Sequence, residues 1–211
     1  MRDLIIIGDG ETAEMAFEYL NTSYNIIAFA VESKFLTINS KFELPIYKLE
    51  EISTHFNPKT HVCFVAVSFI QNNKLRERLY NYIKKEGFSC VSYVHPSCTI
   101  SPHIKSIGEN CLILEQCVLQ RKVTIGDNVF IWSNSTIAHQ SEIKPHAFLA
   151  SNAIVSGFCS VGERSFIGAG VVLKDFITIS NDCIIGAGAV VVKNTESNKC
   201  YIGSPAKELI K

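Results

Sequence analysis

Residues 131–155 read IWSNSTIAHQSEIKPHAFLASNAIV, and an aliphatic side chain recurs at every sixth position of this stretch. The same spacing continues in both directions, from Ile107 to Val191, without a break. An α-helix repeats about every 3.6 residues and a β-strand about every 2, so neither element produces a period of six. A coil with three flat sides of equal length does produce it, because one inward-facing side chain then falls at the same place on each side.

A second small or β-branched position accompanies each aliphatic residue. The aliphatic residues are Ile107, Ile113, Leu119, Ile125, Ile131, Ile137, Ile143, Leu149, Val155, Val161, Ile167, Leu173, Ile179, Ile185 and Val191. Their partners, four residues later, are Cys111, Cys117, Val123, Val129, Ser135, Ser141, Ala147, Ala153, Cys159, Ser165, Val171, Ile177, Cys183, Ala189 and Thr195. Glycine often follows the aliphatic residue directly, as at Gly108, Gly126 and Gly162, and we expect its backbone freedom to help the chain turn each corner.

This hexapeptide pattern resembles the left-handed parallel β-helix of acyltransferases, a solenoid that its sequence period identifies. The resemblance implies such a β-helix over residues 94–196, built from coils of about 18 residues, and a tail over 197–211. It also implies the transfer of acyl groups from coenzyme A.

Composition and charge exclude several classes of function. Lys plus Arg and Asp plus Glu both number 20, so the net charge is zero and no basic surface for nucleic acid is expected. No apolar run reaches the roughly 18 residues that a membrane-spanning helix needs. The N-terminal residues also lack the pattern of a signal peptide, so we expect a cytoplasmic protein.

Eight cysteines raise the possibilities of disulfide bonds and of a metal site. Five of them fall on the small inward positions of the repeat: Cys98, Cys111, Cys117, Cys159 and Cys183. No Cys-x-x-Cys pair is present, and cysteine is a compact filler of apolar cores. We therefore expect free, packed thiols and no bound metal.

Residues 1–93 lack the period of six and predict a separate α/β domain with a small parallel sheet, one half of a Rossmann fold. The apolar strand Leu4–Ile7 is followed by Gly8-Asp9-Gly10-Glu11-Thr12-Ala13 and by a helix that continues to Leu20. Further strands are expected over Ile26–Val31 and His61–Val67, and a second helix over Asn72–Glu86. The Gly-x-Gly-x-x-Ala spacing is a variant of the dinucleotide fingerprint.

The ends of these strands supply candidate nucleotide contacts, because phosphates bind where a strand leads into a helix N-terminus. The candidates are Gly8, Asp9, Gly10, Glu11, Glu32, Ser68 and Asn72. Ninety-three residues hold one mononucleotide half, so the expected ligand is a nucleotide carried by a substrate and not a redox cofactor. The alternative is that the glycines make a tight turn that binds no ligand.

The whole chain resembles the sugar acetyltransferases of the sialic acid O-acetyltransferase type. The resemblance rests on Ile6-Ile7-Gly8-Asp9-Gly10, on Asn72-Asn73-Lys74-Leu75-Arg76, on Val94-His95-Pro96-Ser97 and on Gly203-Ser204-Pro205-Ala206-Lys207. It implies acetyl-CoA as cosubstrate and, as acceptor, the 4-amino group of a UDP-, GDP- or dTDP-linked 4-amino-4,6-dideoxyhexose. It also implies a homotrimer with active sites between subunits.

His139 aligns with the catalytic histidine of this family and suits a general base near neutral pH. Relatives usually place Asp or Glu directly after that histidine, whereas this chain has Gln140, which can orient the ring but carries no charge. Gly157 follows His139 by one coil, and its N–H is expected to face the thioester as an oxyanion donor. His146 is expected to face solvent. The remaining expected coenzyme contacts are Phe148, Ala169, Gly170, Ala187 and Lys207.

Three other functions share parts of this pattern. A γ-class carbonic anhydrase has the same solenoid, but it needs zinc-binding histidines at a spacing that His103, His139 and His146 do not provide. An O-acetyltransferase acting on sialic acid shares both fold and histidine. A non-catalytic assembly scaffold requires only the solenoid.

Overall fold

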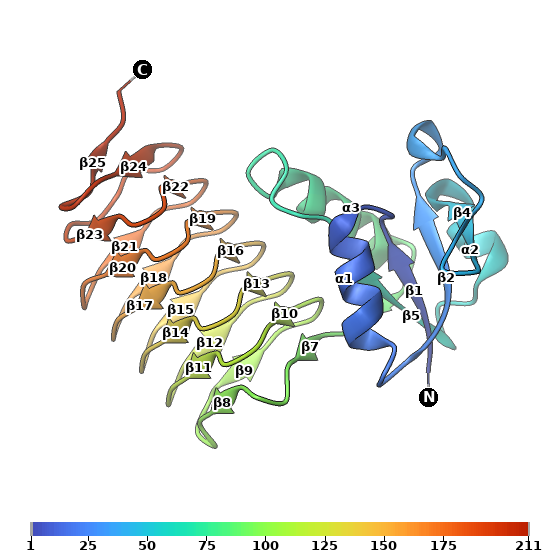
Figure 1. The fold of residues 1–211 in the computed structure, drawn as a ribbon, viewed down its shortest axis with the longest axis horizontal. Coiled ribbons are helices and arrows are strands. Elements are labelled where there is room, and N and C mark those ends of the chain that lie inside the picture. The colour runs from blue at the N-terminus through green and yellow to red at the C-terminus, as the bar shows by residue number, and fades with distance from the viewer. Residues whose placement is uncertain (1, 211) are drawn as a thin grey trace. The chain divides into compact units, whose positions relative to one another are not determined.

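The computed structural model describes residues 2–210, which form two compact units. The first holds the described residues up to Ile70 and the segment Leu75–Ser92, and the second holds Gln71–Lys74 and the chain from Tyr93 onward (Figure 1). The expected tail 197–211 is not a unit of its own, because its strand β24 (Cys200–Ile202) pairs with strand β22 of the solenoid. Residues 1 and 211 of the expected segments lie outside the described part.

The first unit is a sheet of six strands in the order β3-β4-β2-β1-β5-β6. Its strands are β1 (Asp3–Ile7), β2 (Asn25–Val31), β3 (Ser40–Lys41), β4 (Leu44–Lys48), β5 (His61–Val65) and β6 (Ser89–Cys90). Its helices are α1 (Glu11–Leu20), α2 (Ile52–His55) and α3 (Lys74–Lys85), with short 3-10 helices over Ser33–Phe35 and Leu49–Glu51. All pairs are parallel except β3 with β4.

The expected parallel sheet is confirmed, but the hairpin of β3 and β4 was not predicted. Its turn residues Phe42 and Glu43 both have positive φ, at 50° and 61°. Such a turn usually contains Asn or Gly, so the hairpin carries no recognisable sequence signal. The hairpin adds β4 and then β3 beside β2, and it extends that edge of the sheet by two strands.

The second unit is a left-handed parallel β-helix whose two-residue strands form three faces. The first face holds β7 (Tyr93–Val94), β10 (Leu112–Ile113), β13 (Phe130–Ile131), β16 (Phe148–Leu149), β19 (Phe166–Ile167), β22 (Ile184–Ile185), β24 and β25 (Lys207–Glu208). The second face holds β8 (Thr99–Ile100), β11 (Val118–Leu119), β14 (Thr136–Ile137), β17 (Ile154–Val155), β20 (Val172–Leu173) and β23 (Val190–Val191). The third holds β9 (Ser106–Ile107), β12 (Thr124–Ile125), β15 (Glu142–Ile143), β18 (Ser160–Val161) and β21 (Thr178–Ile179).

The period of six corresponds to the interior of this solenoid. From Ile113 to Val191 every aliphatic register residue is at most 2% exposed, and their partners four residues later are buried as well. Cys111, Cys117, Cys159 and Cys183 belong to the same core, and the described residues contain no disulfide bond. The prediction of a hexapeptide core is confirmed at each of these positions.

The corners correct the role expected for the repeat glycines. The residue with positive φ is the third after each aliphatic residue, as at Asn128 (57°), Asn134 (62°) and Asn152 (60°). Asparagine tolerates this left-handed conformation better than most residues. The glycine directly after the aliphatic residue instead permits a close approach of coils, since a Cβ at Gly126 would lie 2.7 Å from the Pro145 nitrogen. We call the corners first, second and third after the face that each one follows.

We expect Ile143→Ala to lower the free energy of unfolding by about 2–5 kcal/mol, because it leaves a cavity in a close-packed interior. Ile143 is 0% exposed, whereas its neighbour Glu142 on the same strand points outward. Glu142→Ala is therefore the matched control and should change stability by less than about 0.5 kcal/mol. Urea denaturation followed by circular dichroism compares the two, and equal effects would contradict the assignment of inside and outside.

Candidate active site

His139 lies at the second corner, two residues after β14. Its backbone N–H donates to Oε1 of Gln120 at 3.0 Å. Its ring packs directly on Gly157 of the next coil, where a Cβ would lie 2.6 Å from the imidazole Cε1 and 3.0 Å from Nε2. The ring also meets Phe158 edge to face, with centroids 5.2 Å apart and planes at 85°. Packing against Gly157 and Phe158 thus holds the imidazole in place.

Gln140 does not orient the ring in this structure. Its backbone has φ of 59° and its N–H donates to the Arg121 carbonyl at 3.0 Å. The side chain is exposed, and among the described residues no hydrogen bond joins its amide to the imidazole. The glycine and the phenylalanine of the following coil therefore take over the positioning expected of Gln140.

The oxyanion role expected for the Gly157 N–H also needs correction. That N–H donates to Oδ1 of Asp175 at 2.8 Å, so it already has a carboxylate acceptor. What the glycine provides here is space, because any side chain at this position would collide with His139.

The expected coenzyme residues fall on other parts of the solenoid than His139. Ala169, Gly170 and Ala187 follow β19 and β22, and they line the first corner as exposed residues. A Cβ at Gly170 would meet no atom within 4 Å, so this corner leaves room for a ligand or a neighbouring molecule. Lys207 is exposed on β25, at the end of the first face.

Phe148 and His146 are not where the sequence analysis expected them. Phe148 lies on the first face, is 3% exposed and stacks on Phe166 with centroids 5.5 Å apart, so it does not border the corner of His139. His146 was expected to face solvent but is 9% exposed at the third corner. Its Nδ1 pairs with Nδ2 of Asn128 at 2.9 Å, in a polar ladder that the six-residue pattern does not reveal.

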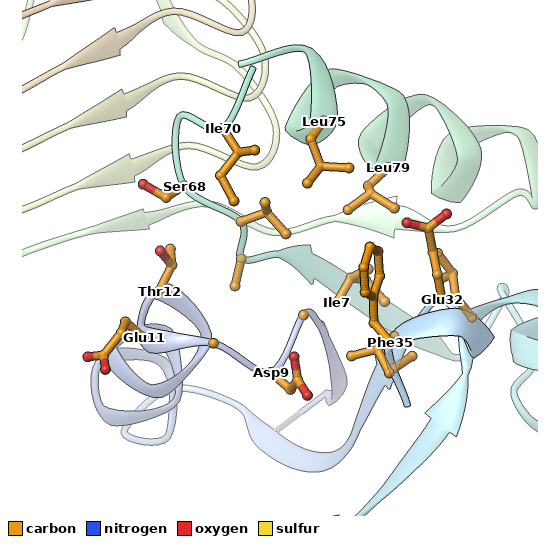
Figure 2. Close-up of a pocket in the computed structure, with 17 residues that line it drawn as sticks. Ile7, Asp9, Glu11, Thr12, Glu32, Phe35, Ser68, Ile70, Leu75 and Leu79 are labelled. Atoms are coloured by element: carbon orange, nitrogen blue, oxygen red, sulfur yellow. The ribbon is translucent and has the colours of Figure 1, made fainter. Parts of the chain in front are cut away.

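Six of the expected nucleotide contacts surround one pocket of about 430 Å³ in the first unit. They come from the loop between β1 and α1, from the end of β2 and from the loop after β5: Gly8, Asp9, Gly10, Glu11, Glu32 and Ser68. Figure 2 shows Thr12 and Ser68 at one end of the pocket and Glu32 with Phe35 at the other. The seventh expected residue, Asn72, does not line the pocket.

Gly8 has to be glycine for the pocket to form. Its φ is 120°, and a Cβ would lie 2.8 Å from the Ala66 carbonyl oxygen. Lys41 of the unpredicted hairpin then secures the turn, because its ammonium donates to the Asp9 carbonyl and pairs with Glu14 at 2.6 Å. Nothing in the sequence connects Lys41 with the turn, because only the hairpin brings the two together.

Glu32 was expected to face a ribose, and in the structure it is held by α3. Both of its carboxylate oxygens accept from the Arg78 guanidinium, at 2.9 and 2.8 Å. Hydrogen bonding from Arg78 lowers the pKa of the Glu32 carboxyl, although burial opposes the shift. A carboxylate that accepts two hydrogen bonds still has free lone pairs, so Glu32 can accept a further hydrogen bond from a ligand hydroxyl.

Comparisons with known proteins agree with this architecture. The family model described as bacterial transferase hexapeptide (six repeats) matches residues 105–139. A histidine-to-asparagine variant of perosamine N-acetyltransferase from Caulobacter crescentus, in complex with CoA and GDP-perosamine, has a TM-score of 0.89 at 26% identity. That match covers 99% of this chain and 97% of the other. No curated protein sequence is significantly similar.

A second solved structure extends the comparison. The acetyltransferase domain of PglB from Neisseria gonorrhoeae has a TM-score of 0.87 at 26% identity, over 99% of this chain and 100% of that domain. The hexapeptide repeat and the fold over nearly the whole chain are thus shared with solved acetyltransferase structures. The predicted resemblance and the predicted fold are both confirmed. Among its described residues the chain has no helix long and apolar enough to cross a membrane, and no cluster of three side chains suited to a metal ion.

We expect Arg78→Met to destabilise the protein at pH 7 by at most about 1 kcal/mol, because Arg78 is half exposed and solvent screens the pair. The folded pKa of Glu32 is depressed, so the stabilisation is complete above the unfolded pKa, about 4.3. It is lost as the pH falls through the folded pKa, so the difference between the two proteins should shrink as the solution is made more acidic.

Urea denaturation at pH 7 and pH 3 measures this difference. Glu32→Gln and the double variant complete the cycle, and at pH 7 Arg78→Met should cost less in the Glu32→Gln background. An equal cost in both backgrounds would mean that Arg78 stabilises the unit through packing alone.

Proposed function

We propose that the chain transfers the acetyl group of acetyl-CoA to the 4-amino group of a nucleotide-linked 4-amino-4,6-dideoxyhexose, in surface polysaccharide or glycan biosynthesis. The observation that carries the proposal is the setting of His139, an imidazole fixed against Gly157 and Phe158 at a solenoid corner. The similarity over nearly the full chain to an enzyme solved with CoA and GDP-perosamine supports the choice of substrates. The PglB domain, solved with acetyl coenzyme A, supports the same donor.

The reaction needs a base for the amine and no covalent enzyme intermediate. The sugar nitrogen attacks the thioester carbonyl, a C–N bond forms, and the C–S bond then breaks. His139 takes the proton that the nitrogen loses and returns it to the departing thiolate of CoA. Its ring nitrogens make no hydrogen bond to other described residues, so both are available for this exchange.

The pocket of the first unit is the proposed site of the nucleotide. Helix α1 follows the Gly8-Asp9 turn, with Gly10 as its N-cap residue. The N–H groups at the start of this helix suit a diphosphate. Apolar side chains such as Ile7, Phe35 and Leu79 line the rest of the pocket and suit the flat faces of a base.

A neighbouring copy that covers the second face would bring the coenzyme residues close to His139. Its outward residues are mainly apolar, and Ile154 is 42% exposed, whereas the third face presents Ser106, Thr124 and Glu142. A second copy that covers this face in a closed ring would bring the first corner of one chain to the second corner of the next. The site of the proposed homotrimer would thus combine His139 from one chain with Ala169, Gly170 and Ala187 from its neighbour.

The activity is tested by thiol release from acetyl-CoA with GDP-, UDP- and dTDP-linked 4-amino-4,6-dideoxyhexoses and with CMP-sialic acid. We expect turnover with at least one amino sugar, and His139→Asn should lower kcat by about 10²–10⁴-fold while leaving the fold intact. Acetylation of CMP-sialic acid alone would favour the O-acetyltransferase. Unchanged turnover in His139→Asn would remove the histidine from the mechanism.

A mixing experiment tests whether neighbouring copies share a site. His139→Asn and Ala187→Trp should each be inactive alone, because one lacks the base and the other blocks the coenzyme. Co-expressed in equal amounts, they should recover activity at about one site in four of a symmetric ring. A chain with both substitutions, co-expressed with His139→Asn, is the inactive control. Lack of recovery in the mixed sample would place both residues in a site within one chain.

A further inference from the structure

Asp175 and His139 touch the same glycine from opposite sides. The strands β14, β17 and β20 pair in register, so the residues that follow them by two positions, His139, Gly157 and Asp175, form one column at the second corner. The imidazole of the first coil packs on Gly157, and the carboxylate of the third accepts its N–H at 2.8 Å. Because Gly157 has no side chain, only its backbone lies between the imidazole and the carboxylate.

The hydrogen bond to Gly157 does not in itself require a charge. Asp127 accepts the Glu109 N–H at 2.8 Å in the same way, and Asn181 accepts the Glu163 N–H at 3.0 Å. An amide therefore caps such a corner as well as a carboxylate does. What sets Asp175 apart is that the residue it caps also contacts an imidazole.

Other charges near His139 do not supply what Asp175 offers. Arg121 occupies the same column one coil before His139 and has the opposite sign. Gln140, beside the histidine in sequence, is neutral. Besides Arg121, the charged side chains around this corner are exposed: Lys122, Glu142, Lys174 and Lys193, which follows Asp175 in the column. Asp175 is itself exposed, and its hydrogen bond to the Gly157 N–H holds the carboxylate beside the glycine.

We propose that Asp175 is a positioning residue for His139. The negative charge of Asp175, presented across Gly157, favours the imidazolium that forms when His139 accepts the proton of the attacking amine. The inference rests on the proposed function, because it assigns His139 the role of base. A fixed carboxylate near a developing positive charge strengthens the base without entering the reaction.

Asp175→Asn tests the charge while keeping the acceptor for Gly157. Without the carboxylate, the imidazolium that forms in the transition state is less well stabilised. We therefore expect kcat to fall about three- to tenfold, while KM for acetyl-CoA and for the amino sugar stays the same. Asp127→Asn, which removes the same charge from an equivalent cap, should leave both quantities unchanged.

Histidine NMR gives a second readout that does not depend on turnover. The ¹³Cε1 chemical shift of His139 at neutral pH, assigned by its loss in His139→Asn, should change in Asp175→Asn and stay the same in Asp127→Asn. Identical shifts in Asp175→Asn and the wild type would overturn the proposal. So would higher activity in Asp175→Ala than in the wild type, since the carboxylate would then be obstructing the Gly157 N–H as an oxyanion donor. A wild-type chain that acetylates no amino sugar overturns the proposed function instead, while the chemical shift still reports on the pair.

Discussion

The in-register pairing of successive coils is the constraint on which the rest of the second unit depends. Backbone bonds such as Thr136 N–H to Ala153 O, 2.9 Å, and Ala138 N–H to Val155 O, 2.8 Å, join each coil to the next. A slip of one residue would turn every inward aliphatic side chain toward solvent, so burial of the ladder fixes the register. Each corner residue is therefore stacked on the residue 18 positions away.

The same stacking gives His146 and His139 different surroundings. At the third corner, Asn110 donates to Asn128 at 2.8 Å, Asn128 pairs with His146, and Arg164 binds Asp182 through two bonds of 2.8 and 2.9 Å. The polar groups of that column satisfy one another, which stabilises the corner. At the second corner, the column from His139 to Asp175 consists of a histidine, a glycine and an acid. The His139 ring is held by packing, so its nitrogens stay available for a substrate.

Local periodicity explains which features were predictable from the sequence. The core positions and the cysteines follow from counting in sixes, since every coil repeats the last. His139 was instead predicted from its match to the catalytic histidine of the family that the chain resembles. A hexapeptide count does not specify which side chains stack on one another. It therefore could not predict the hydrogen bond from Gly157 to Asp175, the burial of His146 or the face on which Phe148 lies. In the first unit the ends of the strands predicted six of the residues that line the pocket. Lys41 and Arg78, which bind Asp9 and Glu32, come from elements distant in sequence and were not predicted.

Two exposed aromatic rings lie near His139. Phe158 and Phe176 stack with centroids 4.8 Å apart, yet they are 42% and 69% exposed. Both have positive φ, 57° and 64°, a conformation that costs energy for bulky residues. Solvent-facing phenylalanines in a strained conformation give a single chain no evident benefit. Covered by a neighbouring copy at the second corner, they would bury apolar area beside the reacting atoms and exclude water from them.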